Sequence, residues 1–217
     1  MNYILVSVLG LILGCFSTAV IYRVPRGMKW GVARSACPNC RTLLAPRDLI
    51  PLFSWLLCRG KCRHCGKPIS KMYPIVELSV AAACILSYAM LGFSITGIFL
   101  IAAIPFLAAS LVIDLDRLIL PDSLTSIVGL LGIGRLAAFA FYGQISDPLS
   151  TAIEFIGGAA LYAGLAWLLG LIMTKALKRD ALGFGDVKFF GVAGLWLGIS
   201  YLGWFCVFSG LFGVLLA

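Results

Sequence analysis

Asp114 and Asp186 are the residues of this sequence best suited to acid–base chemistry. Asp114 closes one long apolar run, and Asp186 opens another directly after Gly183-Phe184-Gly185. Carboxylates at membrane depth are costly, which makes them candidates for a functional site. Two carboxylates that meet share one proton near neutral pH, so they can activate water and polarise a peptide carbonyl. Because Gly183 and Gly185 leave room for an extended peptide chain beside Asp186, the pattern predicts a membrane-embedded aspartic protease.

The other acids near Asp114 fit catalysis less well. Asp114 and Asp116 are about 200° apart on a helix, so only one of them can face a given neighbour. Asp114 directly follows apolar residues, where the charged form is disfavoured, whereas Asp116 stands beside Arg117. Asp122 follows Pro121 and is expected to begin the next helix. The sequence therefore favours Asp114 as the partner of Asp186, although Asp186 could also serve only as a helix cap.

Four cysteines form two Cys-x-x-Cys pairs, Cys37 with Cys40 and Cys62 with Cys65, separated by 21 residues. This spacing is close to that of tetrahedral thiolate zinc sites. Four thiolates leave no open position for water, so the predicted zinc is structural, and it would supply folding energy to a polar segment too short to build much of a core. Two disulfides are the alternative. Cys58 and His64 are expected to be bystanders.

Composition predicts an all-α polytopic membrane protein, because 61% of the 217 residues are apolar and only 12% are charged. Runs of about 20 apolar residues predict about seven transmembrane helices. Residues 1–22 are expected to form the first helix, 23–72 a cytoplasmic zinc-binding segment and 73–217 the transmembrane aspartic protease domain. The predicted spans are 3–22, 74–92, 95–113, 124–142, 151–173, one that begins after Asp186, and 200–217.

The basic residues predict the orientation of these helices. Eleven of the 17 Lys and Arg residues lie between Arg23 and Lys71, and the loops after the third and fifth spans hold most of the rest, including Lys178 and Arg179. Cytoplasmic loops collect such residues, so the N-terminus is expected outside and both aspartates on the cytoplasmic side. The clustering accounts for the net charge of +8 without a nucleic-acid partner. The first apolar run is expected to be a retained helix, because no basic region precedes it.

Two other functions fit buried carboxylates. A proton-coupled transporter would place its sites near the membrane centre, whereas Asp114 and Asp186 fall at span ends. Arg135 and Glu154 lie inside spans and are expected to form a structural pair between helices, with a functional pair as the alternative. A non-catalytic assembly protein of a pilus or secretion system would use the zinc segment as a docking site. Replacing Asp186 by Asn separates these readings, since a scaffold should work unchanged.

In order and spacing, several further motifs resemble one known family, the prepilin peptidases or type IV leader peptidases. The resemblance implies that Asp114 and Asp186 are the catalytic pair. The motifs run from Gly14 to Lys188: Gly14-x-Phe16, Arg23-Val24-Pro25, the two cysteine pairs, Ile50-Pro51-Leu52, Gly60-Lys61-Cys62, Tyr73-Pro74-x-Val76-Glu77, Leu120-Pro121-Asp122 after Asp114, and Gly183-x-Gly185-Asp186-x-Lys188.

The resemblance also implies a substrate and a place. Such enzymes remove the short basic leader of pilin-like precursors at the cytoplasmic face of the bacterial inner or plasma membrane. Their products build type IV pili, type II secretion pseudopili or DNA-uptake pili. The partners expected here are therefore pilin-like precursors and the lipid bilayer. Recognition of a basic leader needs acidic or carbonyl groups, for which Glu77 and Asp48 are candidates.

Many members of this family also methylate the new N-terminus with S-adenosylmethionine. Their first span usually carries Gly-Ser-Phe-Leu-Asn, where this chain has Gly14-Cys15-Phe16-Ser17-Thr18. Thr18 replaces the asparagine, whereas Glu77 is retained. The resemblance therefore leaves open whether the region of Gly14, Thr18 and Glu77 supports methyl transfer. The sequence also lacks the family's usual final Pro-Phe-Gly-Pro-like stretch, which leaves open whether the protein has an eighth helix.

Overall fold

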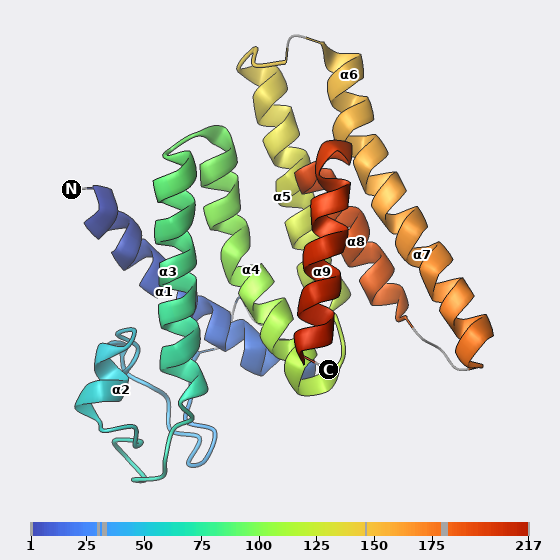
Figure 1. Ribbon diagram of the computed structural model, residues 1–217. Coiled ribbons are helices and arrows are strands. Elements are labelled where there is room, and N and C mark those ends of the chain that lie inside the picture. Colours follow the sequence, from blue (N-terminus) through green and yellow to red (C-terminus); the bar gives the residue numbers. More distant parts are fainter. Residues whose placement is uncertain (1, 30, 32–33, 146, 179–181, 217) are drawn as a thin grey trace. The chain divides into compact units, whose positions relative to one another are not determined.

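The computed structural model describes residues 2–29, 31, 34–145, 147–178 and 182–216, and the regular secondary structure among these residues is helical, with no β-strand. Arg179 and Ala217, which belong to the expected third basic loop and seventh span, fall outside the described residues. The elements along the chain (Figure 1) are α1 (Asn2–Arg23), η1 (Val24–Arg26), η2 (Pro46–Asp48), α2 (Phe53–Leu57), α3 (Met72–Leu91), α4 (Ile95–Arg117), α5 (Asp122–Phe141), α6 (Pro148–Ala152), η3 (Ile153–Gly157), α7 (Gly158–Leu177), α8 (Phe184–Leu197), η4 (Ile199–Tyr201) and α9 (Leu202–Leu216).

Five helical stretches of the described chain are long and apolar enough to cross a membrane: α1 with η1, then α3, α4, α5, and α6 through α7. The pair α8 and α9 passes the same test only jointly and is bent by 111°, so it counts as one broken span or a re-entrant loop. The expected all-α membrane fold is confirmed, but the described chain has five or six spans instead of seven. The reason is length, because α8 has only 14 residues.

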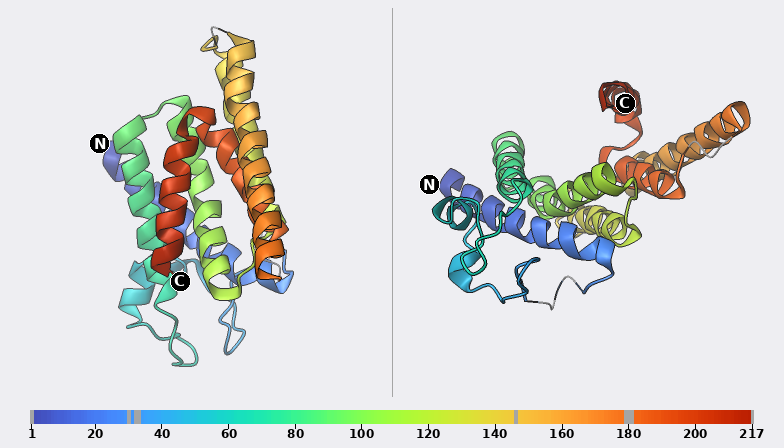
Figure 2. Two further views of the ribbon diagram at one scale, coloured as in Figure 1. Left: turned by 45° about the vertical axis from the view of Figure 1, so that its right-hand side comes forward. Right: turned by 90° about the horizontal axis from the view of Figure 1, so that it is seen from below.

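By its contacts the chain divides into two compact units, Met1–Leu124 and Thr125–Ala217. In the first unit, α1 crosses α3 obliquely, and both pack against α4 (Figures 1 and 2). The core of this unit is aliphatic and includes Val6, Val20, Val80, Ile104 and Ile113, all nearly inaccessible. This burial orients the three helices about a common core.

Two glycines let α1 and α3 approach closely. A Cβ at Gly14 would lie 2.6 Å from the Cα of Glu77, and one at Gly10 would lie 2.7 Å from the Cα of Ala81. Helix pairs in membranes use small residues at such a spacing because packing replaces the hydrophobic effect that water would provide. Gly14 therefore has a packing role in addition to any role near Glu77.

Gly14→Ala is expected to lower the free energy of unfolding by about 1–3 kcal/mol, because the new methyl group must push two backbones apart. The measurement is thermal unfolding of the full chain in detergent. The matched control is Gly164→Ala in α7, where the added methyl group meets no atom within 4 Å. The control should be neutral or slightly stabilising, since Ala favours helix over Gly. Equal effects at the two positions would contradict the close-packing role.

Helix α4, which corresponds to the third expected span, is longer than expected and includes Asp114 and Asp116 at its C-terminal end. The sequence placed the end of this span at residue 113, whereas α4 continues through Asp114 and Asp116 to Arg117. Leu118 caps the C-terminal end of α4: its backbone is left-handed (φ 54°), and its amide donates to the Asp114 carbonyl oxygen. The C-terminal end of α4, the start of α3 and the cysteine segment all lie at the same end of this unit (Figure 1).

The second unit holds α7 and α8 side by side, with α5 and α9 (Figures 1 and 2). Gly158 of α7 and Gly194 of α8 pack so closely that a Cβ at Gly158 would lie 2.8 Å from the Gly194 carbonyl oxygen. The chain enters α7 through a short π-helical stretch, η3. It leaves α8 at Gly198, whose φ of 77° suits a glycine.

Candidate functional site

The two cysteine pairs fold into two copies of one turn, offset by 25 residues. In the first copy the Cys37 amide donates to Thr42 O (3.0 Å), and in the second the Cys62 amide donates to Lys67 O (2.8 Å). Isolated bridges join Ala36 with Leu43 and Lys61 with Pro68 at the same offset. The left-handed position after each pair is filled by Arg41 (φ 58°) and Gly66 (φ 69°). Each turn therefore presents two sulfurs in the same way.

The four sulfurs of these turns form a single cluster. One ligand atom each from Cys37, Cys40, Cys62 and Cys65 lies within 4.8 Å of the other three. A tetrahedral zinc with bonds of about 2.3 Å holds its sulfurs about 3.8 Å apart, so the cluster fits the ion after a small contraction. Cys37 Sγ and Cys65 Sγ are 4.0 Å apart, beyond a disulfide bond, and all eight cysteines are free thiols. The cluster can therefore hold a metal such as zinc, and Cys58 and His64 are not part of it.

Hydrogen bonds prepare two of the thiols for a metal. The side chain and amide of Thr42 lower the pKa of the Cys40 thiol to about 6, and backbone amides of Cys65 and His64 lower the pKa of Cys62. The Lys67 amide acts on Cys65 in the same sense, but burial and the neighbouring thiols raise the pKa of Cys65 to about 11. Neighbouring thiolates repel one another, so the pKa of some of these thiols stays high until a bound cation neutralises the negative charge.

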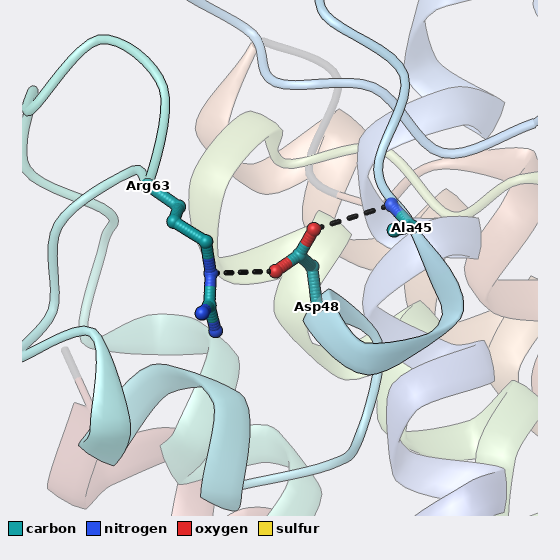
Figure 3. Close-up of polar contacts among 3 residues, drawn as sticks. All are labelled: Ala45, Asp48 and Arg63. Atoms are coloured by element: carbon teal, nitrogen blue, oxygen red, sulfur yellow. Dashed lines mark hydrogen bonds and ion pairs between the residues drawn. The ribbon is translucent and has the colours of Figure 1, made fainter.

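The cysteine segment is also held together by Asp48 and Trp55. The Asp48 carboxylate pairs with Arg63 Nε at 3.0 Å and accepts the Ala45 amide at 3.2 Å (Figure 3). Trp55 packs on Gly60 and its indole N–H donates to Ile69 O at 3.4 Å. Asp48 thus ties the second turn to η2, and the expected recognition of a leader by Asp48 would compete with an existing ion pair.

A cavity of about 910 Å³ lies between α1, α3 and the cysteine segment. Thr18 and Glu77 both line it, as do Tyr22, Trp55 and Tyr73. The buried Glu77 carboxylate accepts the Leu52 amide at 2.6 Å, at a residue with positive φ (62°) directly before α2. The Thr18 hydroxyl donates to Cys15 O at 2.7 Å, within its own helix. The structure therefore brings Thr18 of α1 and Glu77 of α3 to one cavity large enough for a small molecule, whereas Gly14 does not line this cavity and packs against the Glu77 backbone.

At the C-terminal end of α4, Asp114 and Asp116 have different surroundings. Asp114 is half-buried and takes part in polar interactions, whereas the Asp116 side chain is 74% exposed and pairs with Arg117 at 3.4 Å. Asp122 begins α5, as expected. The half-buried environment is the one that distinguishes an acid suited to catalysis from a solvated one.

Asp186 lies in the first turn of α8 and is half-buried. One of its carboxylate oxygens accepts the Gly183 amide at 3.1 Å, so Asp186 does cap its own helix. A Cβ at Gly183 would lie 3.3 Å from this oxygen, which explains a small residue there. Gly185 lies in the same turn. This hydrogen bond holds the carboxylate over the first turn of α8.

Two family models together match most of the chain. The profile of the Bacterial Peptidase A24 N-terminal domain matches residues 8–91, and that of the Type IV leader peptidase family matches residues 100–217. The chain belongs to the type IV leader peptidase family. As a member of this peptidase family, it is an enzyme, and its apolar helices make it a multi-pass membrane protein. No solved structure is significantly similar to it.

Curated relatives support this assignment along most of the chain. The "Type 4 prepilin-like proteins leader peptide-processing enzyme" of Escherichia coli O78:H11 is 35% identical over 213 residues, which cover 90% of this chain and 77% of that protein. A "Prepilin leader peptidase/N-methyltransferase" of Pectobacterium carotovorum subsp. carotovorum is 37% identical (88% and 74% covered). A protein of the same name in Bacillus subtilis is 33% identical (96% and 79% covered).

Proposed function

We propose that the protein is an aspartic endopeptidase that removes the basic leader of pilin-like precursors, with Asp114 and Asp186 as its catalytic pair. The observation that carries this proposal is family membership combined with a half-buried carboxylate at each of the two matching helix ends. The names of the curated relatives, which describe prepilin leader processing, support the choice of substrate.

In the proposed reaction the two carboxylates share one proton. The ionised member removes a proton from water, which attacks the scissile carbonyl while the protonated member donates to the carbonyl oxygen. The tetrahedral intermediate collapses as the peptide nitrogen takes a proton from the pair. No covalent enzyme intermediate forms, and the proton belongs to the pair as a whole.

Chain connectivity supports a common membrane side for both acids. Asp114 lies at the end of α4, and α5 begins after a short connection. A chain that crosses the bilayer in α5 and returns in α7 brings the start of α8, with Asp186, back to the side it left. The excess of Lys and Arg in the segment after α1 supports the cytoplasm as that side, with the N-terminus outside. The bacterial inner or plasma membrane is the corresponding location.

The cysteine cluster would serve as a structural zinc centre. Four sulfurs complete a tetrahedral zinc, so no coordination position remains for water or substrate. Its proposed role is to fold residues 23–72 against α3, where the cavity and Glu77 lie. The transmembrane part, residues 73–217, would carry the protease chemistry.

A second activity, N-methylation of the cleaved product, is favoured by the cavity beside Glu77. Its volume and its mixed polar and aromatic lining suit a methyl donor such as S-adenosylmethionine, and two curated relatives are named N-methyltransferases. Thr18, whose hydroxyl is engaged within α1, stands where the family usually has asparagine.

One experiment tests both activities. The purified full chain in detergent is incubated with a pilin-like precursor and S-adenosylmethionine, and the product N-terminus is analysed by mass. We expect loss of the leader, and an added methyl mass only if the cavity supports transfer despite Thr18. An uncleaved precursor, with a relative such as the B. subtilis protein active in parallel, would overturn the proposed function.

A further inference from the structure

The break between α8 and α9 lies against two intramembrane charged residues, Arg135 of α5 and Glu154 of η3. Arg135 is only 4% exposed, and Nη1 and Nη2 donate to the carbonyls of Trp196 and Leu195 at 3.1 and 3.2 Å. The Glu154 carboxylate accepts the Ser200 amide at 2.9 Å. Arg135 and Glu154, both among the described residues, form no ion pair with each other, so the expected direct pair is wrong.

The charge of each of these two side chains is opposite in sign to the partial charge of the helix end that it contacts. The last carbonyls of a helix carry partial negative charge, and Arg135 meets them at the end of α8. The first amides of a helical segment carry partial positive charge, and Glu154 meets one at the start of η4. Backbone groups freed by a break inside a membrane must find partners in protein, because lipid offers none. The two side chains supply those partners.

Aromatic side chains also hold the C-terminal end of α8, and together with Arg135 and Glu154 they form what we call the α8 anchor. The Trp196 indole donates to Val128 O on α5 at 3.0 Å, and the Tyr162 hydroxyl of α7 donates to Gly198 O at 3.1 Å. The Arg135 guanidinium lies 4.9 Å from the ring centres of both Trp196 and Phe155. The C-terminal end of α8 is thereby fixed to both α5 and α7.

We propose that Arg135, with Glu154 and Tyr162, is a positioning residue that holds α8 at the depth and tilt at which Asp186 works. This inference rests on the proposed function of Asp186. The anchor at Leu195 lies about 14 Å along the helix from Asp186, so a tilt of about 10° about it would move the carboxylate by about 2 Å. Misplacement by about 1 Å can cost about 100-fold in rate.

The test compares Arg135→Met, Arg135→Lys and Tyr162→Phe in the full chain with the control Lys175→Met, which removes an exposed charge from α7. Arg135→Met is expected to lower kcat for precursor cleavage about 10-fold or more while KM changes less than about 2-fold. Arg135→Lys should recover part of kcat by retaining one donor. Tyr162→Phe should cause a smaller loss, and Lys175→Met should leave kcat unchanged.

A second readout does not depend on activity. Hydrogen–deuterium exchange of residues 187–197 should quicken in Arg135→Met and Tyr162→Phe, while exchange in α5 and α7 stays as in the unsubstituted protein. Unchanged kcat together with unchanged exchange in α8 would overturn the proposal. If Arg135→Met does not fold, Tyr162→Phe decides the question by the same two readouts. If the unsubstituted protein itself fails to cleave, the proposed function fails. Hydrogen–deuterium exchange alone then tests whether Arg135 and Tyr162 hold α8 in place.

Discussion

Asp114→Asn and Asp186→Asn are each expected to lower kcat for precursor cleavage by about 1,000-fold or more. General acid–base catalysis contributes about 100- to 10,000-fold per group, and one acid cannot both activate water and protonate the carbonyl oxygen. Amide and carboxyl groups have nearly the same shape, so binding of the precursor should be retained. The measurement is single-turnover cleavage of a precursor by the purified variant.

Asp116→Asn is the matched control, because Asp116 lies two residues from Asp114 on the same helix but is largely exposed. This variant should cleave within about 2-fold of the unsubstituted rate, as a surface ion pair contributes little. Loss of activity in Asp116→Asn with full activity in Asp114→Asn would reverse the assignment. A protein that cleaves normally without either Asp114 or Asp186 is not an aspartic protease of the proposed kind.

Cys62→Ser is expected to abolish metal binding and unfold the cysteine segment. Serine cannot replace a thiolate as a zinc ligand, and binding of structural zinc to small domains contributes about 10–16 kcal/mol that a segment of this size cannot supply otherwise. The unsubstituted protein should contain one zinc per chain by elemental analysis, and Cys62→Ser less than about 0.1. Limited proteolysis should then cut between Arg23 and Lys71 in the variant alone.

Cys58→Ser is the control for this experiment, because Cys58 lies four residues from Cys62 but outside the sulfur cluster. It should retain one zinc and the protected segment. Removal of the metal by a chelator from the unsubstituted protein should reproduce the proteolytic pattern of Cys62→Ser. If the purified chain holds no metal and the segment still resists proteolysis, the cluster is not a zinc site.

The sequence predicted the helices of this protein well where composition decides them. The starts and ends of α1, α3 and α5 agree within about two residues with the expected spans, because apolar runs bounded by Arg23, Gly92 and Asp122 leave few alternatives. The cysteine cluster was equally predictable, because the spacing of its two Cys-x-x-Cys pairs is itself typical of a four-cysteine metal site. The expected third span stops at residue 113, short of Asp114, because apolar length says little about how far a polar helix end continues.

The α8–α9 region shows what an apolar pattern leaves undetermined. Residues 187–217 read as two spans because their composition meets the length criterion, but composition does not say whether two consecutive helices are collinear. The sharp bend depends on the positive φ of Gly198 and on side chains from α5, η3 and α7 that are distant in sequence. The partners of Arg135 and Glu154 could not be predicted for the same reason: they are backbone atoms.

The brevity of α8 has a consequence for the surrounding lipid. Fourteen helical residues extend about 21 Å, which is less than the roughly 30 Å of a typical hydrocarbon layer. Because α8 and α9 count together as one broken span or a re-entrant loop, lipids beside the bend between them are expected to compress or to admit headgroups and water.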